Sequence, residues 1–398
     1  MNDNEALKQR VIDEVEARRE ELIRVADTLF ANPEIAFEEF ESAALLSGVL
    51  EENGFAVERG VAGLETAFVA TLRGRADTPR VAFLAEYDAL PELGHACGHN
   101  LIGTAALGAG LAMKAVLPEL EGTIQVIGTP AEERGGGKVI LVQGGVFERV
   151  DAAMMVHPSG RNMTRRKSLT SHKIGIEFFG RAAHAAAWPD AGINALDAVI
   201  QTFNGINALR QHLRDDARIH GIITHGGRVT NIVPDYAAAQ FGVRAADVGY
   251  AEQIIEKIRA CAEGAARATG ARLEFETQEA YYANMMPNPK LADLMDANMV
   301  ALGIEVRLPL PNERMGSSDM GNVSQTVPAL HPYIAIGPED LAGHTVEFRE
   351  AAGSLAGHEG MIKAAKAMAM TAVDLLAAPA NLAEVKRAFQ EQKGEQTG

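Results

Sequence analysis

The chain has 398 residues, too many for one ordinary hydrophobic core, so two domains are expected. Hydrophobic residues make up 47% of the chain and charged residues 23%, a composition typical of soluble globular proteins. The net charge of −16 at pH 7 argues against a nucleic-acid partner, which would require a basic face.

Compartment and membrane signals are weak along the chain. The two cysteines, Cys97 and Cys261, give no disulfide framework and indicate a reducing compartment. The N-terminus lacks a basic segment followed by an apolar stretch, so no secretory signal is expected. The longest apolar run, residues 101–117, contains Lys114 and is slightly short of a membrane span. We therefore expect a cytoplasmic protein without a membrane partner.

The first part of the chain alternates helical and strand patterns. Residues 5–31 carry apolar side chains at helical spacing, Asn32-Pro33 stops this helix, and a second helix follows over 38–52. A small-residue helix is expected over residues 101–116. Short apolar strands are expected at residues 56–58, 67–72, 81–85, 123–128 and 152–156. This alternation predicts an α/β domain with a mostly parallel sheet and helices on both faces.

A different order begins near Ser168. The expected strands are 174–179, 219–224, 237–244 and 272–280, and the expected helices are 194–213 and 251–269. Their β-α-β-β-α-β order is that of a ferredoxin-like α+β unit. We therefore assign residues 1–168 and 286–398 to one discontinuous domain and residues 169–285 to an inserted domain. Later segments are expected to form helices over 289–302 and 351–376, a strand at 333–336 and a frayed tail from Ala378.

Three apolar strands of the first domain end in residues capable of chemistry. These residues are Cys97 and His99, the pair Glu132 and Glu133, and His157. Open α/β sheets place their ligands at this end of the strands. A thiolate and an imidazole two residues apart in a turn can both point at one metal ion. Of two adjacent carboxylates, one can bind the metal while the other serves as a general base.

Each of these residues also has an ordinary structural explanation. A Glu-Glu pair is usually a solvated surface, and single histidines such as His157, His184 and His344 are often core or loop residues. The glutamate pair differs from an arbitrary pair because it ends a buried strand and precedes a glycine triplet, Gly135–Gly137. His95 and His358 give no separate argument for metal binding.

Several motifs together resemble a known family. The segments that carry the likeness are Glu86–Pro91, His95–Asn100, Pro130–Glu133, Gly180–Ala186, Asn231–Asp235, Ser318–Met320 and Gly343–Phe348. They resemble the clan MH di-zinc aminoacylase and carboxypeptidase-like metallopeptidases. The nearest resemblance is to the amidohydrolase branch, which includes hydrolases of auxin conjugates, hippurate and aminobenzoyl-glutamate. The likeness covers nearly the whole chain.

The resemblance implies a metal-dependent amidohydrolase acting on an N-acyl amino acid or a dipeptide-like substrate. It implies two divalent ions per subunit, zinc or manganese, held by Cys97 as a bridging thiolate and by His99, Glu133, His157 and His344. A metal-bound hydroxide would be the nucleophile, with Glu132 as general base and Asp88 as a supporting carboxylate. The domain formed by residues 169–285 would serve as a lid and as the contact of a homodimer.

The same resemblance implies roles for residues of the inserted domain. His184 would reach an active site, often that of the dimer partner, and polarise the scissile carbonyl. Asn231 and Arg244 would hold the carbonyl or a carboxylate of the substrate. A structural salt bridge would explain Arg244 equally well.

Some positions depart from the pattern of the branch. Many members have Arg-Ala-Asp where this chain has Leu84-Ala85-Glu86, and Asp where it has Asn100. Glu86-Tyr87-Asp88 instead resembles a sub-branch of dipeptidases acting on dipeptides with a basic residue, which stays an alternative. Two other classes also stay open: a non-catalytic binding protein of the same fold, and a thiol enzyme with Cys97 as nucleophile. Metal analysis and sensitivity to chelators distinguish them.

Overall fold

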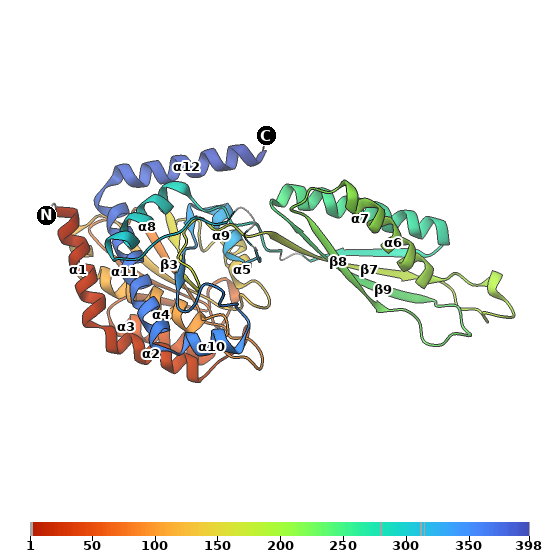
Figure 1. The fold of residues 1–398 in the computed structure, drawn as a ribbon, viewed down its shortest axis with the longest axis horizontal. Coiled ribbons are helices and arrows are strands. Elements are labelled where there is room, and N and C mark those ends of the chain that lie inside the picture. Colours follow the sequence, from red (N-terminus) through yellow and green to blue (C-terminus); the bar gives the residue numbers. More distant parts are fainter. Residues whose placement is uncertain (1–2, 279–280, 311–312, 314, 398) are drawn as a thin grey trace. The chain divides into compact units, whose positions relative to one another are not determined.

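The computed structural model describes residues 3–278, 281–310, 313 and 315–397, which form two compact units. The first unit comprises Met1–Lys167, Met285–Arg314 and Ser318–Gly398, and the second comprises Ser168–Asn284 and Met315–Ser317 (Figure 1). The short segment Met315–Ser317 therefore packs with the second unit, although the sequence-based division leaves it in the discontinuous domain.

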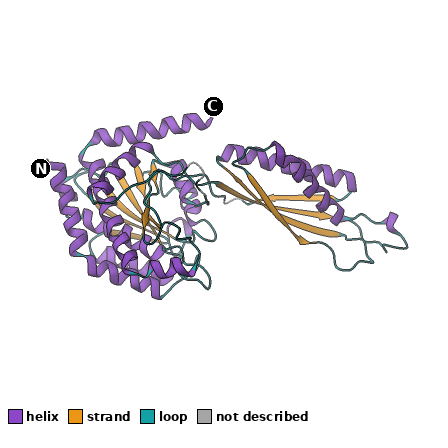
Figure 2. Cartoon of the chain, in the orientation of Figure 1, coloured by secondary structure: helices purple, strands orange, loops and turns teal. Residues whose placement is uncertain are grey.

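The first unit contains a six-stranded sheet of mostly parallel strands (Figure 2). Its strands, in spatial order, are β1 (Ala56–Arg59), β2 (Phe68–Arg73), β4 (Thr123–Thr129), β3 (Arg80–Glu86), β5 (Ala152–Met154) and β11 (Ala329–Leu330). Strands β4, β3, β5 and β11 run parallel, and β1 and β2 form an antiparallel edge. A separate parallel pair joins β6 (His157–Ser159) to β12 (Tyr333–Ala335). The predicted mostly parallel sheet is confirmed.

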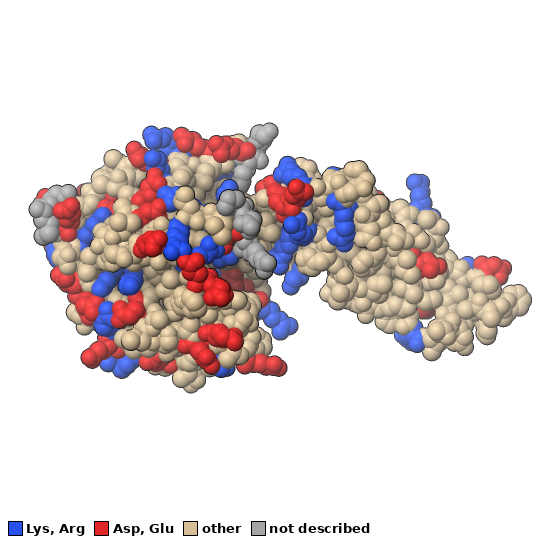
Figure 3. Space-filling view, in the orientation of Figure 1, with Lys and Arg blue, Asp and Glu red and all other residues tan. Residues whose placement is uncertain are grey.

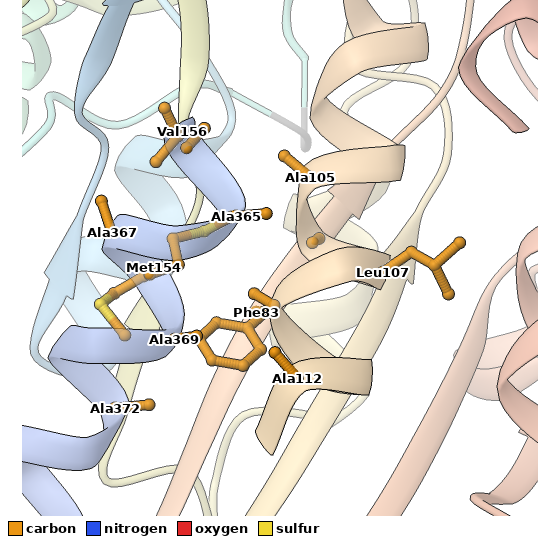
Figure 4. Close-up of a cluster of buried hydrophobic side chains, with 14 of the residues drawn as sticks. Phe83, Ala105, Leu107, Ala112, Met154, Val156, Ala365, Ala367, Ala369 and Ala372 are labelled. Carbon is orange, nitrogen blue, oxygen red and sulfur yellow. The ribbon is translucent and has the colours of Figure 1, made fainter. Parts of the chain in front are cut away.

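Helices cover both faces of this sheet, as predicted. Alternate residues of β3 enter different cores, because successive side chains of a strand point to opposite faces. Phe83 belongs to the core under α4 (His99–Met113) and α11 (Leu355–Ala377), where Figure 4 shows it between Ala112 and Ala369. Leu84 belongs to the opposite core, beside α5 (Gly137–Gln143) and α9 (Met320–Thr326). The strand ends are thus held between two layers of helices.

The remaining helices of the first unit differ in part from expectation. They are α1 (Asp3–Ala17), α2 (Arg19–Ala31), α3 (Phe40–Glu52), α8 (Pro289–Ala301), α10 (Val346–Ala352) and α12 (Pro379–Thr397). The expected helix over residues 5–31 is interrupted at Arg18. The expectation of a frayed tail is wrong, because α12 buries Val385 and Phe389 on one helical face.

The second unit has the predicted ferredoxin-like order. Its antiparallel sheet contains β10 (Arg272–Thr277), β7 (Thr170–Phe179), β9 (Tyr236–Ala245) and β8 (Arg218–His225), in that spatial order. Helices α6 (Ala195–Leu209) and α7 (Val248–Thr269) pack on one face, over side chains such as Ile176 and Phe241. Residues 279–280, which the sequence places in the last strand, lie outside the described residues.

Two surface properties bear on the environment of the protein. On the face shown in Figure 3, acidic and basic side chains are interspersed over the first unit. None of the helices in the described part of the chain combines the length and apolar character needed to cross a membrane.

Candidate metal centre

The loop between β3 and α4 brings a thiol and an imidazole together. Gly98 separates Cys97 from His99 and has a left-handed backbone with φ of +78°. A Cβ atom at this position would lie 2.8 Å from Cγ of Pro158 in β6, so the loop can approach this strand only with glycine here. This close approach places Cys97 and His99 next to His157, with 3.9 Å between Sγ of Cys97 and Nε2 of His157.

All five sequence-derived ligand candidates converge in the first unit. Potential ligand atoms lie within 4.8 Å of one another in three groups: Cys97, His99 and His157; Cys97, Glu133 and His344; and His99, Glu132 and Glu133. The sulfur of Cys97 belongs to two of these groups. Two neighbouring ions that share one sulfur ligand would therefore fit this arrangement.

His344 joins the centre from a segment far along the chain. Its backbone N–H donates to the carbonyl of Ala96 at 2.9 Å, next to Cys97. The backbone φ of His344 is +62°, an uncommon value for a residue other than glycine. Its Nε2 lies 3.5 Å from Oε1 of Glu133. The hydrogen bond to Ala96 thus fixes the histidine beside the loop that carries the thiol.

Asp88 orients two of the candidate ligands at once. Its Oδ2 accepts the backbone N–H of Glu133 at 2.9 Å, and its Oδ1 lies 3.0 Å from Nδ1 of His99. The carbonyl of Asp88 is also 2.8 Å from that nitrogen. Because both neighbours of Nδ1 are acceptors, Nδ1 carries a proton, and Nε2 is the ring nitrogen left to bind a metal ion. Asp88 therefore contacts both candidate ligands, His99 and Glu133.

The unsatisfied polar atoms of the centre match the requirements of a cation. Nε2 of His99 and Oε1 of Glu133 are buried without a hydrogen-bond partner among the described residues. Oε1 of Glu86 lies 3.0 Å from Nε2 of His99 but outside hydrogen-bonding geometry. Buried acceptors rarely remain unpaired, and a metal ion satisfies several of them together. The sulfur, imidazole and carboxylate donors fit zinc, and the carboxylates also suit manganese.

Burial favours the neutral forms of several side chains around the centre. Burial raises the pKa of the Cys97 thiol above its ordinary value and lowers the pKa of His157 to about 4. Burial, together with repulsion from Glu86 and Asp319, raises the pKa of Glu132 well above its ordinary value. Without a cation, therefore, the centre favours neutral side chains at these positions.

A buried ion-pair network behind His99 was not singled out from the sequence. Lys138, in the first turn of α5, is hydrogen-bonded through its ammonium to Oε2 of Glu86 and, at 2.7 Å, to Oδ1 of Asp319. Oδ2 of Asp319 accepts the backbone N–H of Lys138 at 2.9 Å. Burial opposes both charges, yet the ammonium holds the pKa of Glu86 well below its usual range, and the carboxylates raise that of Lys138. A lone lysine before the apolar run 139–142 was the available sequence signal.

The three remaining candidates lie in the second unit. His184 and Asn231 are exposed on adjacent loops, where the N–H of Ala185 donates to the carbonyl of Asn231 at 2.9 Å. Arg244, on β9, donates to the hydroxyl of Ser317. No salt bridge joins Arg244 to an acidic group of the described residues.

Comparisons with known proteins agree on one family. The sequence model of the family described as "Peptidase family M20/M25/M40" matches residues 82–384. Mouse Xaa-Arg dipeptidase is 38% identical over 400 residues, covering 97% of this chain and 93% of the relative. A p-aminobenzoyl-glutamate hydrolase polypeptide of Escherichia coli K12 is 31% identical over 458 residues, covering 95% and 94%.

A solved structure supports the same fold. The YXEP protein of Bacillus subtilis, described as a dinuclear metal binding peptidase from the M20 family, matches with a TM-score of 0.74. The two sequences are 23% identical, and the match covers 91% of this chain and 99% of that one.

Proposed function

The chain belongs to peptidase family M20/M25/M40, and from that premise we propose that it hydrolyses the amide bond of N-acyl amino acids or dipeptide-like substrates. The observation that carries this proposal is the convergence of a thiol, imidazoles and carboxylates at the ends of neighbouring strands. The family membership makes the chain a hydrolytic enzyme, and the geometry of the centre supports the residue roles proposed below.

The proposed ligands are the five residues that the sequence singles out. Two divalent ions, zinc or manganese, would be held by Cys97, shared between them, and by His99, Glu133, His157 and His344. When bound, these ions supply an activated water and polarise the carbonyl of the substrate. Asp88 keeps the ligand nitrogen of His99 and the backbone of Glu133 in place.

Glu132 and His184 are the proposed catalytic residues. The carboxylate of Glu132 accepts a proton from the attacking water and transfers it to the leaving nitrogen. A carbon–oxygen bond forms, the carbon–nitrogen bond breaks, and the products are a carboxylic acid and an amine. His184 donates a hydrogen bond to the carbonyl oxygen as negative charge develops there. Asn231 and Arg244 bind the carbonyl or carboxylate groups of the substrate.

The first unit is proposed as the catalytic domain and the second as the lid and dimerisation domain of a homodimer. Support for the dimer comes from β8, an edge strand of its sheet that exposes Ile222 and Ile223. An exposed apolar edge strand invites pairing with another strand. We also propose a cytoplasmic location, because a reducing compartment keeps Cys97 available as a thiol ligand.

A dipeptidase specific for a basic residue is the second candidate. It is favoured by the mouse Xaa-Arg dipeptidase, which is 38% identical over 97% of this chain. The motif Glu86-Tyr87-Asp88 led to the same alternative from the sequence. Both candidates use the same centre, and the second requires a basic residue on the amine side of the amide bond.

One hydrolysis screen tests both candidates. The purified protein, loaded separately with zinc, manganese and cobalt, is offered Xaa-Arg and Xaa-Lys dipeptides, aminobenzoyl-glutamate and simple N-acyl amino acids. Release of free amine is measured, with Cys97→Ser as the control for metal dependence. Preference for the Xaa-Arg and Xaa-Lys dipeptides selects the dipeptidase. Metal-loaded protein that cleaves none of these amides contradicts the proposed function.

A further inference from the structure

The carboxylate of Glu39 does not make the hydrogen bond that its position in the chain predicts. Glu39 occupies the N-cap position of α3, a position whose side chain commonly accepts N–H groups of the first turn, but its own side chain makes no capping hydrogen bond. Glu34 performs that task instead. Its carboxylate accepts the N–H of Glu41 at 3.0 Å and the N–H of Ser42 at 2.8 Å. Glu39 is thereby released for another contact.

That contact is made with the turn that carries the glutamate pair. The side chain of Glu39 is fully buried, and its Oε1 accepts the backbone N–H of Ala131 at 2.8 Å. Its Oε2 accepts the hydroxyl of Thr66 at 3.0 Å. Burial, with a smaller contribution from Asp88, raises the pKa of Glu39 to about 7. The group is therefore partly protonated at neutral pH, and the turn requires its acceptor oxygen rather than its charge.

Ala131 has a backbone conformation that needs outside support. Its φ is +59°, in the left-handed region that residues with a Cβ seldom adopt. Its carbonyl accepts the N–H of Gly136 at 2.9 Å, which closes the turn. Strained residues of this kind persist where the surrounding structure fixes them, often beside functional groups. The residue that follows Ala131 is Glu132.

Glu132 is flanked by two buried carboxylates that hold the backbone on either side of it. Glu39 accepts the N–H of Ala131, the preceding residue, and Asp88 accepts the N–H of Glu133, the following residue. Resting on the proposed function, we propose that Glu39 is a positioning residue that fixes the carboxylate of Glu132 through the amide of Ala131. Catalytic groups must be held closely in place, because a displacement of about 1 Å can reduce the rate on the order of 100-fold.

The test compares two substitutions of Glu39 with one of Thr66. Glu39→Gln retains an acceptor oxygen for Ala131, so kcat is expected within about twofold of wild type. Glu39→Met has a similar length but no acceptor, so kcat is expected to fall by about 10- to 100-fold. KM and metal content, measured by elemental analysis, are expected to stay unchanged. Thr66→Val removes only the second hydrogen bond of the carboxylate and is expected to retain kcat, even where its thermal midpoint falls.

The outcomes separate this inference from the proposed function. Wild-type kcat in Glu39→Met, together with loss of turnover in Glu132→Gln, overturns the positioning role and leaves the function intact. Wild-type turnover in Glu132→Gln overturns the role of Glu132 as general base and with it this inference, whereas the proposed function is contradicted only if the metal-loaded wild type cleaves none of the amides. Equal losses of kcat in Glu39→Met and Thr66→Val indicate a merely structural role and also overturn the inference. Should Glu39→Met fail to fold, Glu39→Asp, whose oxygens are withdrawn by one methylene, is judged by the same criteria.

Discussion

The two units of the molecule differ in how many ionisable side chains they bury. The first unit buries Glu39, Glu86, Asp88, Lys138 and Asp319 in and around the candidate centre. In the described residues of the second unit, His172 is the only buried side chain among the Asp, Glu, His, Lys and Arg residues. The cores are otherwise alike, with aliphatic side chains packed between helices and a sheet.

This difference shows whether the candidate functional groups of each unit are buried or exposed. Burying a charge is unfavourable unless a partner compensates it, so the first unit retains its buried charges in a connected network. The second unit has an apolar framework and presents its polar candidates, His184 and Asn231, on exposed loops. We expect substitutions in the first unit to affect folding and catalysis together. Substitutions in the loops of the second unit should affect catalysis alone.

The sharpest test of the first unit is Glu132→Gln. Loss of a general base is expected to reduce kcat by about 10²- to 10⁴-fold. Amide hydrolysis is measured at saturating substrate, and elemental analysis establishes that the metal content is unchanged. Activity close to wild type would remove Glu132 from the proposed mechanism.

Lys138→Met tests whether the buried network supports the fold. This change leaves the carboxylates of Glu86 and Asp319 buried without their cation, so the free energy of unfolding is expected to fall by about 3–5 kcal/mol. Urea unfolding measures the loss. The matched control is Glu256→Gln in the second unit, which breaks an exposed pair with Arg259 and is expected to change stability by less than about 1 kcal/mol. Similar losses in the two variants would abolish the contrast between the units.

His184→Ala tests the exposed loops of the second unit. Removal of a donor to the developing oxyanion is expected to reduce kcat by about 10²-fold, with the thermal midpoint and metal content unchanged. His212→Ala provides the control, because His212 is another exposed histidine of the same unit. Kinetics of His184→Ala equal to those of this control would contradict the catalytic role.

The smallest effect is expected from the buried histidine of the second unit. Burial lowers the pKa of His172, whose ring stacks on Tyr281 with centroids 4.1 Å apart, to about 4. The unfolded chain binds the proton more readily, because its histidine has a pKa near the ordinary value of about 6.5. The contribution of His172 to the free energy of unfolding is therefore fully present above that pH. It is lost as the pH falls toward 4, by about 1–2 kcal/mol after discounting for solvent screening.

His172→Phe is expected to flatten this dependence, because phenylalanine keeps the stacking and cannot take up a proton. Unfolding by urea is compared at pH 7 and pH 4.5 in the two proteins. An unchanged difference between the two pH values would show that His172 does not cause it.

Much of the centre could be foreseen because it follows from the order of the strands. Parallel strands end at the same edge of a sheet, so Cys97, Glu133 and His157 were expected to meet. His344 could not be placed by that argument, since it lies on a loop after the last strand, and only the family resemblance indicated it. The tail was misjudged because its few apolar residues are spread among many charges.

Other residues could not be recognised because their significance depends on distant partners. Glu39 resembles an ordinary helix cap until Glu34 is seen to perform that task and Ala131 to receive its carboxylate. Lys138 is a single charge before an apolar run, and its partners Glu86 and Asp319 are far away in the sequence. Local patterns identify elements, whereas such contacts arise only from their assembly.

The hydrogen bond between the N–H of His344 and the carbonyl of Ala96 also affects the order in which the molecule matures. During synthesis, the chain delivers Cys97 well before His344, and nearly all of the second unit is made in between. Closing so long an interval is entropically costly, and it becomes favourable only when the late segments pack onto the early ones. A centre that holds its full complement of metal therefore indicates that the late segments of the first unit have packed onto the early ones. A chain released early would carry most of the ligands but not a finished centre.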